Sequence, residues 1–232
     1  MVSLKMNKNS LRNIATEVID LKINSLKILK KSINKNFDKA VNSIVDCQSK
    51  IILCGVGKSG LIASKIASTF SSVGSPAFSL SANDCLHGDL GSITKKDVLI
   101  LISNSGKSEE IVPIIKFANR NKIKLIGIVS KKKSFLYKAS DIKILLPEVK
   151  ESGLGVVPTS STSIQLAIGD ALAVAALKKK QFSKYDFSRL HPGGNLGRQL
   201  KTVGDIMVLG NKIPFITENK NMKETLKIIS EK

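Results

Sequence analysis

The fold is decided by residues 98–110, which have the sequence VLILISNSGKSEE. The first five residues contain no polar side chain, a pattern typical of a buried strand in a parallel sheet. The turn that follows is rich in hydroxyl groups, contains Gly106 and leads into a segment that we expect to be helical. Because the N-terminus of a helix favours anions, Ser103, Ser105 and Ser108 form a predicted phosphate cup. On these residues alone, an equal alternative is that the serines only cap the helix.

Length and composition set outer bounds on the class of protein. The chain has 232 residues, of which 42% are hydrophobic. This is enough for one sizeable α/β domain and a shorter additional segment. No long apolar region precedes residue 31, so we expect no signal peptide. The longest apolar stretch, 164–177, is shorter than the roughly 20 residues of a membrane span and predicts a buried helix with no membrane partner. Three scattered cysteines without metal or redox spacing predict reduced thiols in the cytoplasm.

The formal net charge of +19 raises the question of nucleic-acid binding. Nearly all of the basic residues are lysines spread along the chain, and aromatic residues make up only 4% of it. Base recognition and stacking favour arginine and aromatic side chains instead. We therefore expect a solvated basic surface that attracts an anionic metabolite, and no nucleic-acid partner.

Apolar runs along the chain predict alternating strands and helices. Helical periodicity over residues 8–47 indicates two helices before the first strand. The later alternation implies a parallel sheet covered by helices on both faces, with ligands at the carboxyl ends of the strands. The predicted strands are 51–54, 77–80, 98–102, 125–129 and 142–146, and the predicted helices are 59–72, 108–121, 135–139 and 164–177.

A glycine-rich turn, GVGKSG, occupies residues 55–60 between a predicted strand and helix. It matches the dinucleotide fingerprint G-x-G-x-x-G, but residues 78–81 at the end of the second strand lack the acid that would hold a ribose. The Walker A pattern fails as well, because Ile52 stands where its first glycine is required. Lys58 nevertheless suggests a contact to a phosphate or a sugar oxygen. The alternative is an exposed lysine at a helix start, which the helix dipole disfavours.

A second hydroxyl-rich loop and two histidines complete the candidates for chemistry. Residues 158–163, PTSSTS, contain more hydroxyl groups than one helix cap requires. Glu151 lies shortly before them, and from composition alone we expect an ordinary surface carboxylate. His87 and His191 both lie in glycine-rich turns, where a pKa near neutrality would suit an acid or a base.

The motifs GVGKSG, LHGDLG, ISNSGKSEE, PTSSTS, GDALAVAAL and HPGGNLGR follow one another in this order between roughly residues 10 and 200. In this set the chain resembles the sugar isomerase (SIS) domain family, and within it the arabinose-5-phosphate isomerases of Kdo and lipopolysaccharide synthesis. The resemblance implies a three-layer α-β-α sandwich with a five-stranded parallel sheet, a homotetramer, and no metal or other cofactor. It also implies interconversion of D-arabinose 5-phosphate and D-ribulose 5-phosphate through an enediol.

The resemblance implies roles for particular residues. Either Glu151 or Glu110 would be the base, and Lys58 would stabilise the enediolate. His191 would relay protons between oxygens or act as the ring-opening acid. The predicted catalytic residues are Lys58, Glu110, Glu151, His191 and His87. The predicted substrate-binding residues are Gly57, Ser59, Ser103, Ser105, Ser108, Thr159, Ser160 and Ser161.

Two departures from the family pattern leave the exact sugar phosphate open. Lys107 and Asp84 stand where relatives usually carry glutamate. One alternative is therefore an isomerase of another sugar phosphate. A second alternative, which the resemblance itself raises because many SIS domains bind without turnover, is a sugar-phosphate sensor.

The C-terminal residues 203–232 resemble the opening of a cystathionine-beta-synthase (CBS) module. We therefore expect two domains, an isomerase domain at 1–202 and a partial CBS-like segment at 203–232. Because half of a CBS module cannot cover its own apolar residues, we expect this segment to be weakly ordered and dispensable for catalysis.

Overall fold

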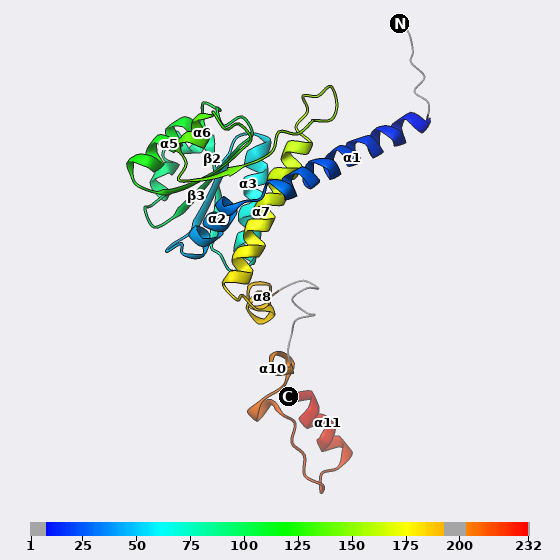
Figure 1. Ribbon diagram of the computed structural model, residues 1–232. Coiled ribbons are helices and arrows are strands. Elements are labelled where there is room, and N and C mark those ends of the chain that lie inside the picture. The colour runs from blue at the N-terminus through cyan, green and yellow to red at the C-terminus, as the bar shows by residue number, and fades with distance from the viewer. Residues whose placement is uncertain (1–7, 193–202, 232) are drawn as a thin grey trace. The chain divides into compact units, whose positions relative to one another are not determined.

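The computed structural model describes residues 8–192 and 203–231 (Figure 1). The chain divides into two compact units, Met1–Ser183 and Lys184–Lys232. The predicted domain boundary after residue 202 lies next to 193–202, outside the described residues, and stays a prediction. The first unit contains the whole sheet and is the larger of the two.

The sheet consists of five parallel strands in the order β2-β1-β3-β4-β5. Every predicted strand is confirmed to within one residue at each end. The parallel α/β sandwich expected from the sequence is therefore confirmed. The strands are β1 (Ile51–Gly55), β2 (Ala77–Ser81), β3 (Val98–Ser103), β4 (Lys124–Val129) and β5 (Ile142–Leu145).

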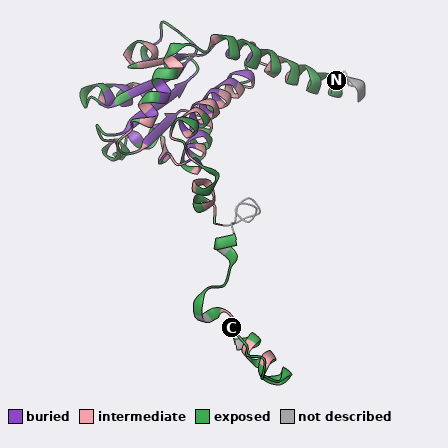
Figure 2. Cartoon of the chain, turned by 60° about the horizontal axis from the view of Figure 1, so that its bottom comes forward, coloured by how far each residue is buried: buried purple, intermediate pink, exposed green. Residues whose placement is uncertain are grey.

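Helices cover both faces of the sheet, because successive side chains of each strand point to opposite faces. In β1, Leu53 packs on one face with α2 (Lys35–Val45), α3 (Lys58–Ser72) and α7 (Ser160–Lys179). Its neighbour Ile52 packs on the other face, which α4 (Ala82–Cys85), α5 (Ile111–Arg120) and α6 (Phe135–Ala139) cover. Figure 2 shows that buried residues concentrate in the sheet, where the central strands β1, β3 and β4 are buried along nearly their whole length.

The N-terminal helix α1 (Lys8–Ser32) contacts the body of this unit through its last turns. Leu29 is buried there, and α1 packs against α7. The earlier turns of α1 extend past the sheet and are largely exposed (Figures 1 and 2). The two helices predicted before the first strand are confirmed as α1 and α2.

Helix α7 passes the length and composition test for a membrane span. It packs against α1, α2 and α3, and Ile164, Leu172 and Ala176 are fully buried in the core. The prediction of a buried core helix is therefore confirmed for this stretch. The helix begins at Ser160, four residues before its predicted start.

Several helices differ from the expectation. Helix α5 begins at Ile111 and not at Ser108, because the residues before it form a separate turn. Six further elements among the described residues were not predicted, and most of them are too short for periodicity to indicate. These are α4, a 3₁₀ turn η1 (Asp89–Ser92), and in the second unit α8 (Lys184–Leu190), α10 (Val203–Ile206), η2 (Gly210–Lys212) and the longer α11 (Met222–Glu231).

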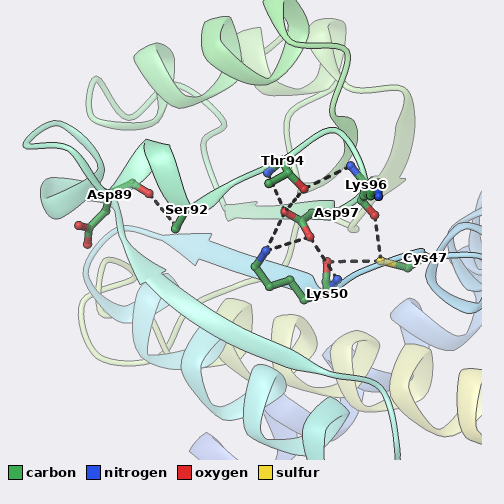
Figure 3. Close-up of polar contacts among 7 residues, drawn as sticks. All are labelled: Cys47, Lys50, Asp89, Ser92, Thr94, Lys96 and Asp97. Atoms are coloured by element: carbon green, nitrogen blue, oxygen red, sulfur yellow. Dashed lines mark hydrogen bonds and ion pairs between the residues drawn. The ribbon is translucent and has the colours of Figure 1, made fainter.

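A buried carboxylate fastens the amino ends of β1 and β3 (Figure 3). Asp97 is 2% exposed and accepts hydrogen bonds from the backbone N of Lys50 at 3.2 Å and from its Nζ at 3.1 Å. It also accepts from the backbone N of Thr94 at 2.7 Å and from its Oγ1 at 3.0 Å. Burial alone would raise the pKa of Asp97, but the hydrogen bonds from Thr94 and Lys50 outweigh it and lower that pKa. The cluster holds the edge of the sheet opposite the candidate site.

Replacing this carboxylate should destabilise the fold. Asp97→Ala leaves the donors of Thr94 and Lys50 without their acceptor, so we expect a loss of about 2–3 kcal/mol in the free energy of unfolding. Urea denaturation measures it. The control Asp46→Ala removes an exposed carboxylate at the end of α2 and should change stability by less than about 0.5 kcal/mol. Equal effects of the two variants would contradict a structural role for Asp97.

Candidate active site

The carboxyl ends of the five strands meet at one edge of the sheet. Helices α3 and α5 connect parallel strands and α7 follows β5, so all three run back from this edge and present their N-termini to it. From β1 the chain crosses to β2, and from β3 it crosses to β4, so the connections diverge between β1 and β3. In open α/β sheets ligands bind at such a point, and helix N-termini there favour an anion.

The glycine-rich turn after β1 is shaped by close backbone approach. A Cβ atom on Gly55 would lie 2.8 Å from the backbone of Ser59, and one on Gly60 would lie 2.8 Å from the carbonyl oxygen of Gly55. Gly57 adopts a positive φ of 56°. This compact turn places Lys58 as the first residue of α3, exposed at the carboxyl edge of the sheet.

Ser59 ties this turn to α7. Its Oγ donates to Oε1 of Gln165 at 3.2 Å, and Gln165 is 1% exposed. Ser59 was predicted to bind substrate, and in this structure its hydroxyl also holds α3 and α7 together. Gln165 was missed as a site residue, because a lone glutamine inside an apolar run gives no sequence signal for a contact 106 residues away.

The turn after β3 is organised by its own serines. Ser103 is buried; its Oγ accepts from the backbone N of Gly106 at 3.0 Å and lies 3.4 Å from Oγ of Ser108. Oγ of Ser105 accepts from the backbone N of Lys107 at 3.2 Å, and Ser105 itself is exposed. These hydroxyls can still donate to an anion, because each of the two bonds from the backbone uses only an acceptor lone pair.

Glu151 lies at the N-terminus of α7 and is not an ordinary surface carboxylate as composition suggested. Its Oε2 accepts from the backbone N of Thr159 at 2.8 Å, from Oγ1 of Thr159 at 3.0 Å and from the backbone N of Ser160 at 2.8 Å. Its Oε1 accepts from the backbone N of Ser161 at 3.2 Å. Glu151 therefore satisfies N–H groups that Thr159, Ser160 and Ser161 would otherwise offer to a substrate.

These contacts set the ionisation of Glu151. Burial alone would raise the pKa of its carboxyl, but the hydrogen bonds from Ser161 and Thr159 outweigh burial and lower that pKa. The carboxylate is thus held ionised and is a weaker base than an ordinary glutamate. The hydroxyl of Ser160 is buried and has no hydrogen-bond partner in the part of the chain that the structure describes.

Glu110 has a different position. It is the N-cap residue of α5, is partly exposed, and its side chain makes no capping hydrogen bond. Its carboxylate is therefore not engaged by the helix that it precedes, unlike that of Glu151. Both glutamates lie at helix starts on the carboxyl edge of the sheet.

The structure places the two histidines in different units. His87 is exposed on the loop that follows β2 and α4, at the same edge of the sheet as the serine turns. His191 belongs to the second unit, where its ring stacks on Phe187 at 3.8 Å between centroids and its Nδ1 lies 2.8 Å from the carbonyl oxygen of Phe187. The rest of the HPGGNLGR motif, from residue 193, lies outside the described residues.

No candidate metal centre is present among the residues that the structure describes: there, no three His, Cys, Asp or Glu side chains are grouped to hold an ion. Cys47, Cys54 and Cys85 are free thiols. The expected absence of a metal requirement remains a prediction.

Together the fold and the site define a parallel α/β sandwich whose carboxyl edge is suited to binding an anion. Comparisons with known proteins support this class. The SIS domain model matches residues 44–175. The arabinose 5-phosphate isomerase KdsD of Francisella tularensis is 43% identical over 234 residues, which cover 99% of this chain and 72% of that protein. KdsD of Yersinia pestis is 42% identical over 218 residues, which cover 93% of this chain and 66% of that protein.

A solved structure of an Escherichia coli CFT073 protein in complex with arabinose 5-phosphate superposes with a TM-score of 0.78 at 34% identity, covering 81% of this chain and 100% of that one. The chain belongs to the SIS domain family. It spans between about two thirds and 72% of the length of these two KdsD relatives.

The cap formed by Glu151 should make stability depend on pH. Because the folded-state pKa lies below the ordinary value of 4.5, the ionised cap stabilises the fold above that value, and this stabilisation is lost as the pH falls through the folded pKa. At neutral pH, Glu151→Gln should cost about 1–2 kcal/mol in the free energy of unfolding. Thermal unfolding between pH 7 and pH 3 should show the difference from wild type shrinking towards acid pH.

The control Glu17→Gln changes an exposed glutamate on α1 and should leave stability nearly unchanged at every pH. A cost of Glu151→Gln that stays constant down to pH 3 would contradict a cap that acts through its charge.

Proposed function

We propose that this protein is an aldose–ketose isomerase that interconverts D-ribulose 5-phosphate and D-arabinose 5-phosphate, supplying Kdo and lipopolysaccharide synthesis. The single observation that carries the proposal is the gathering of Lys58, Glu110 and the serine turn 103–108 at the carboxyl edge of the sheet, on a chain that resembles arabinose 5-phosphate isomerases over nearly its whole length. The solved relative that holds arabinose 5-phosphate supports the same substrate class.

The reaction moves one proton between C1 and C2 of the sugar. A base removes the proton from C1 of the ketose, the electrons of the broken C–H bond form the enediolate, and the proton returns to C2 to give the aldose. A second group moves a proton between the two oxygens, and a cation stabilises the enediolate oxygen. In this proposal Ser103, Ser105 and Ser108 hold the phosphate and Lys58 supplies the cation.

Glu110 is the better candidate for the base. Its side chain makes no capping hydrogen bond, whereas four donors engage the carboxylate of Glu151 and lower its pKa. A base whose pKa is lowered takes up a proton less readily. In this proposal Glu151 is a positioning residue, which fixes the start of α7 and its hydroxyl-bearing first turn. His191 remains the proposed relay between the oxygens, and His87 a second acid–base candidate.

The partners and the compartment are part of the same proposal. We propose a homotetramer, because several apolar side chains along α1 remain exposed to solvent in the single chain. They are Leu11, Ile14, Ile19, Ile23, Leu26 and Ile28, each exposed by 39% or more. The free thiols support a reducing compartment, the cytoplasm, and the enzyme would act without a metal, a cofactor or a nucleic-acid partner.

A second candidate function is a sensor that binds the sugar phosphate without turnover. It would need the serine turn for the phosphate but no base. The carboxylate of Glu110 makes no capping hydrogen bond to α5 and lies at the same edge of the sheet as Lys58 and the serines. Its presence there favours the enzyme.

The proposal is tested by mixing the purified full chain with D-ribulose 5-phosphate in the presence of a chelator and quantifying D-arabinose 5-phosphate. We expect turnover without added metal. Ser105→Ala should mainly raise KM, whereas Glu110→Gln should lower turnover by about 100- to 10,000-fold, the range of acid–base groups. The control Glu109→Gln changes the exposed neighbouring acid and should leave turnover near wild type.

Tight binding of the sugar phosphate without product would favour the sensor. Turnover of another sugar phosphate alone would move the substrate assignment within the family. Glu110→Gln with wild-type turnover would remove Glu110 from the mechanism.

A further inference from the structure

A cleft of about 440 Å³ opens beside the serine turn, between the loop after β3 and the segment after β4. We call it the lysine cleft. The proposed sugar-phosphate site uses only Ser105 among the residues that line this cleft. It is lined by Ser105, Lys107, Lys131, Lys132, Lys133, Ser134 and Glu148.

The two walls of the lysine cleft are fixed to each other. The backbone N of Ser130 donates to the carbonyl oxygen of Asn104 at 3.2 Å, and its Oγ donates to Oδ1 of Asn104 at 2.7 Å. The backbone N of Leu136 donates to the carbonyl oxygen of Gly106 at 3.2 Å. Gly106 has a positive φ of 62°, and a Cβ atom there would lie 2.3 Å from Oγ of Ser134. The lysines therefore project from backbones held in contact, not from two independent loops.

The charge of the lysine cleft is mostly uncompensated. Nζ of Lys131 lies 2.7 Å from Oε2 of Glu148, which neutralises one of the four lysines. Glu148 is the only acid among the lining residues, so three positive charges remain. Ammonium groups that line one cleft repel each other, and an anion that binds among them relieves the repulsion.

We propose that the lysine cleft binds a chain of linked phosphate groups, such as inorganic tripolyphosphate or the triphosphate of a nucleotide. Its volume falls within the range of about 300–1,000 Å³ that is usual for sites of whole small molecules, and it exceeds what one phosphate fills. Three separate ammonium groups match several phosphates in series better than one, and lysine binds phosphate as a point charge without needing a fixed orientation.

The site is distinct from the proposed sugar-phosphate site but borders it. Ser105 lies in the serine turn and also lines the lysine cleft, and Lys107 follows it by two residues. A bound polyphosphate should therefore raise the KM for the sugar phosphate by competing for this shared wall. Binding itself does not depend on isomerase activity.

The test measures binding of inorganic tripolyphosphate to the full chain by calorimetry at low ionic strength, with inorganic phosphate for comparison. We expect tripolyphosphate to bind more tightly than phosphate. The double variant Lys132→Glu/Lys133→Glu should weaken tripolyphosphate binding by about tenfold or more, since it reverses two charges in the cleft. The matched control Lys95→Glu/Lys96→Glu makes the same change of net charge in an exposed pair before β3, at the other edge of the sheet, and should leave binding within about twofold.

Equal weakening by the two pairs would mean attraction by the overall charge and would overturn the site. No weakening by Lys132→Glu/Lys133→Glu, or phosphate bound as tightly as tripolyphosphate, would overturn it as well. If the charge-reversed variant fails to fold by circular dichroism, Lys132→Gln/Lys133→Gln supplies the same comparison with a smaller expected loss.

ATP provides the second arm of the experiment. ATP binding that exceeds tripolyphosphate binding assigns the site to a nucleotide, and weaker ATP binding assigns it to polyphosphate itself. Isomerase turnover at saturating sugar phosphate should be unchanged in Lys132→Glu/Lys133→Glu. A negative result in the isomerase assay and a negative result in the binding measurement can therefore be told apart.

Discussion

The structure depends first on the parallel pairing of β1 and β3. Both strands are buried along their whole length, and their register places Gly55 opposite Ile102, one residue before the serine turn. From this pair the chain crosses outward in opposite directions, so the two turns that follow the strands are left side by side at the carboxyl edge. A substitution that shifted this register would move the phosphate-suited turns as well as the core, since each strand side chain faces one of the two helix layers.

Electrostatics at the carboxyl edge separates two glutamates that the sequence alone could not rank. Glu151 accepts hydrogen bonds from the start of α7 and is held as an anion there, whereas Glu110 precedes α5 without capping it. The same edge carries the cations Lys58 and Lys107, the second of which faces the lysine cleft. In the functions proposed above, one side of this edge carries the acid–base chemistry and the other holds a larger anion.

The fold was predictable from local patterns, and the contacts between distant segments were not. The strands could be predicted because apolar runs such as 98–102 are short, rich in β-branched residues and bounded by turns. The capping of α7 by Glu151 could not be predicted. It depends on the loop between Glu151 and α7, which folds back through a bridge between Ser152 and Val157. The bond between Ser59 and Gln165 likewise joins residues that no periodicity relates. Positions at strand ends, such as Ser103 and Lys58, were found because parallel sheets gather them at one edge.

In the proposed mechanism Glu110 transfers a proton between C1 and C2 of the sugar, and an enediolate is the intermediate. Incubation of the protein with D-arabinose 5-phosphate in deuterium oxide, followed by nuclear magnetic resonance of the sugar, observes that step directly. With the wild-type protein we expect deuterium to replace the proton at C2, and we expect Glu110→Gln to slow this exchange by about 100-fold or more. Exchange at the wild-type rate in Glu110→Gln would contradict this mechanism.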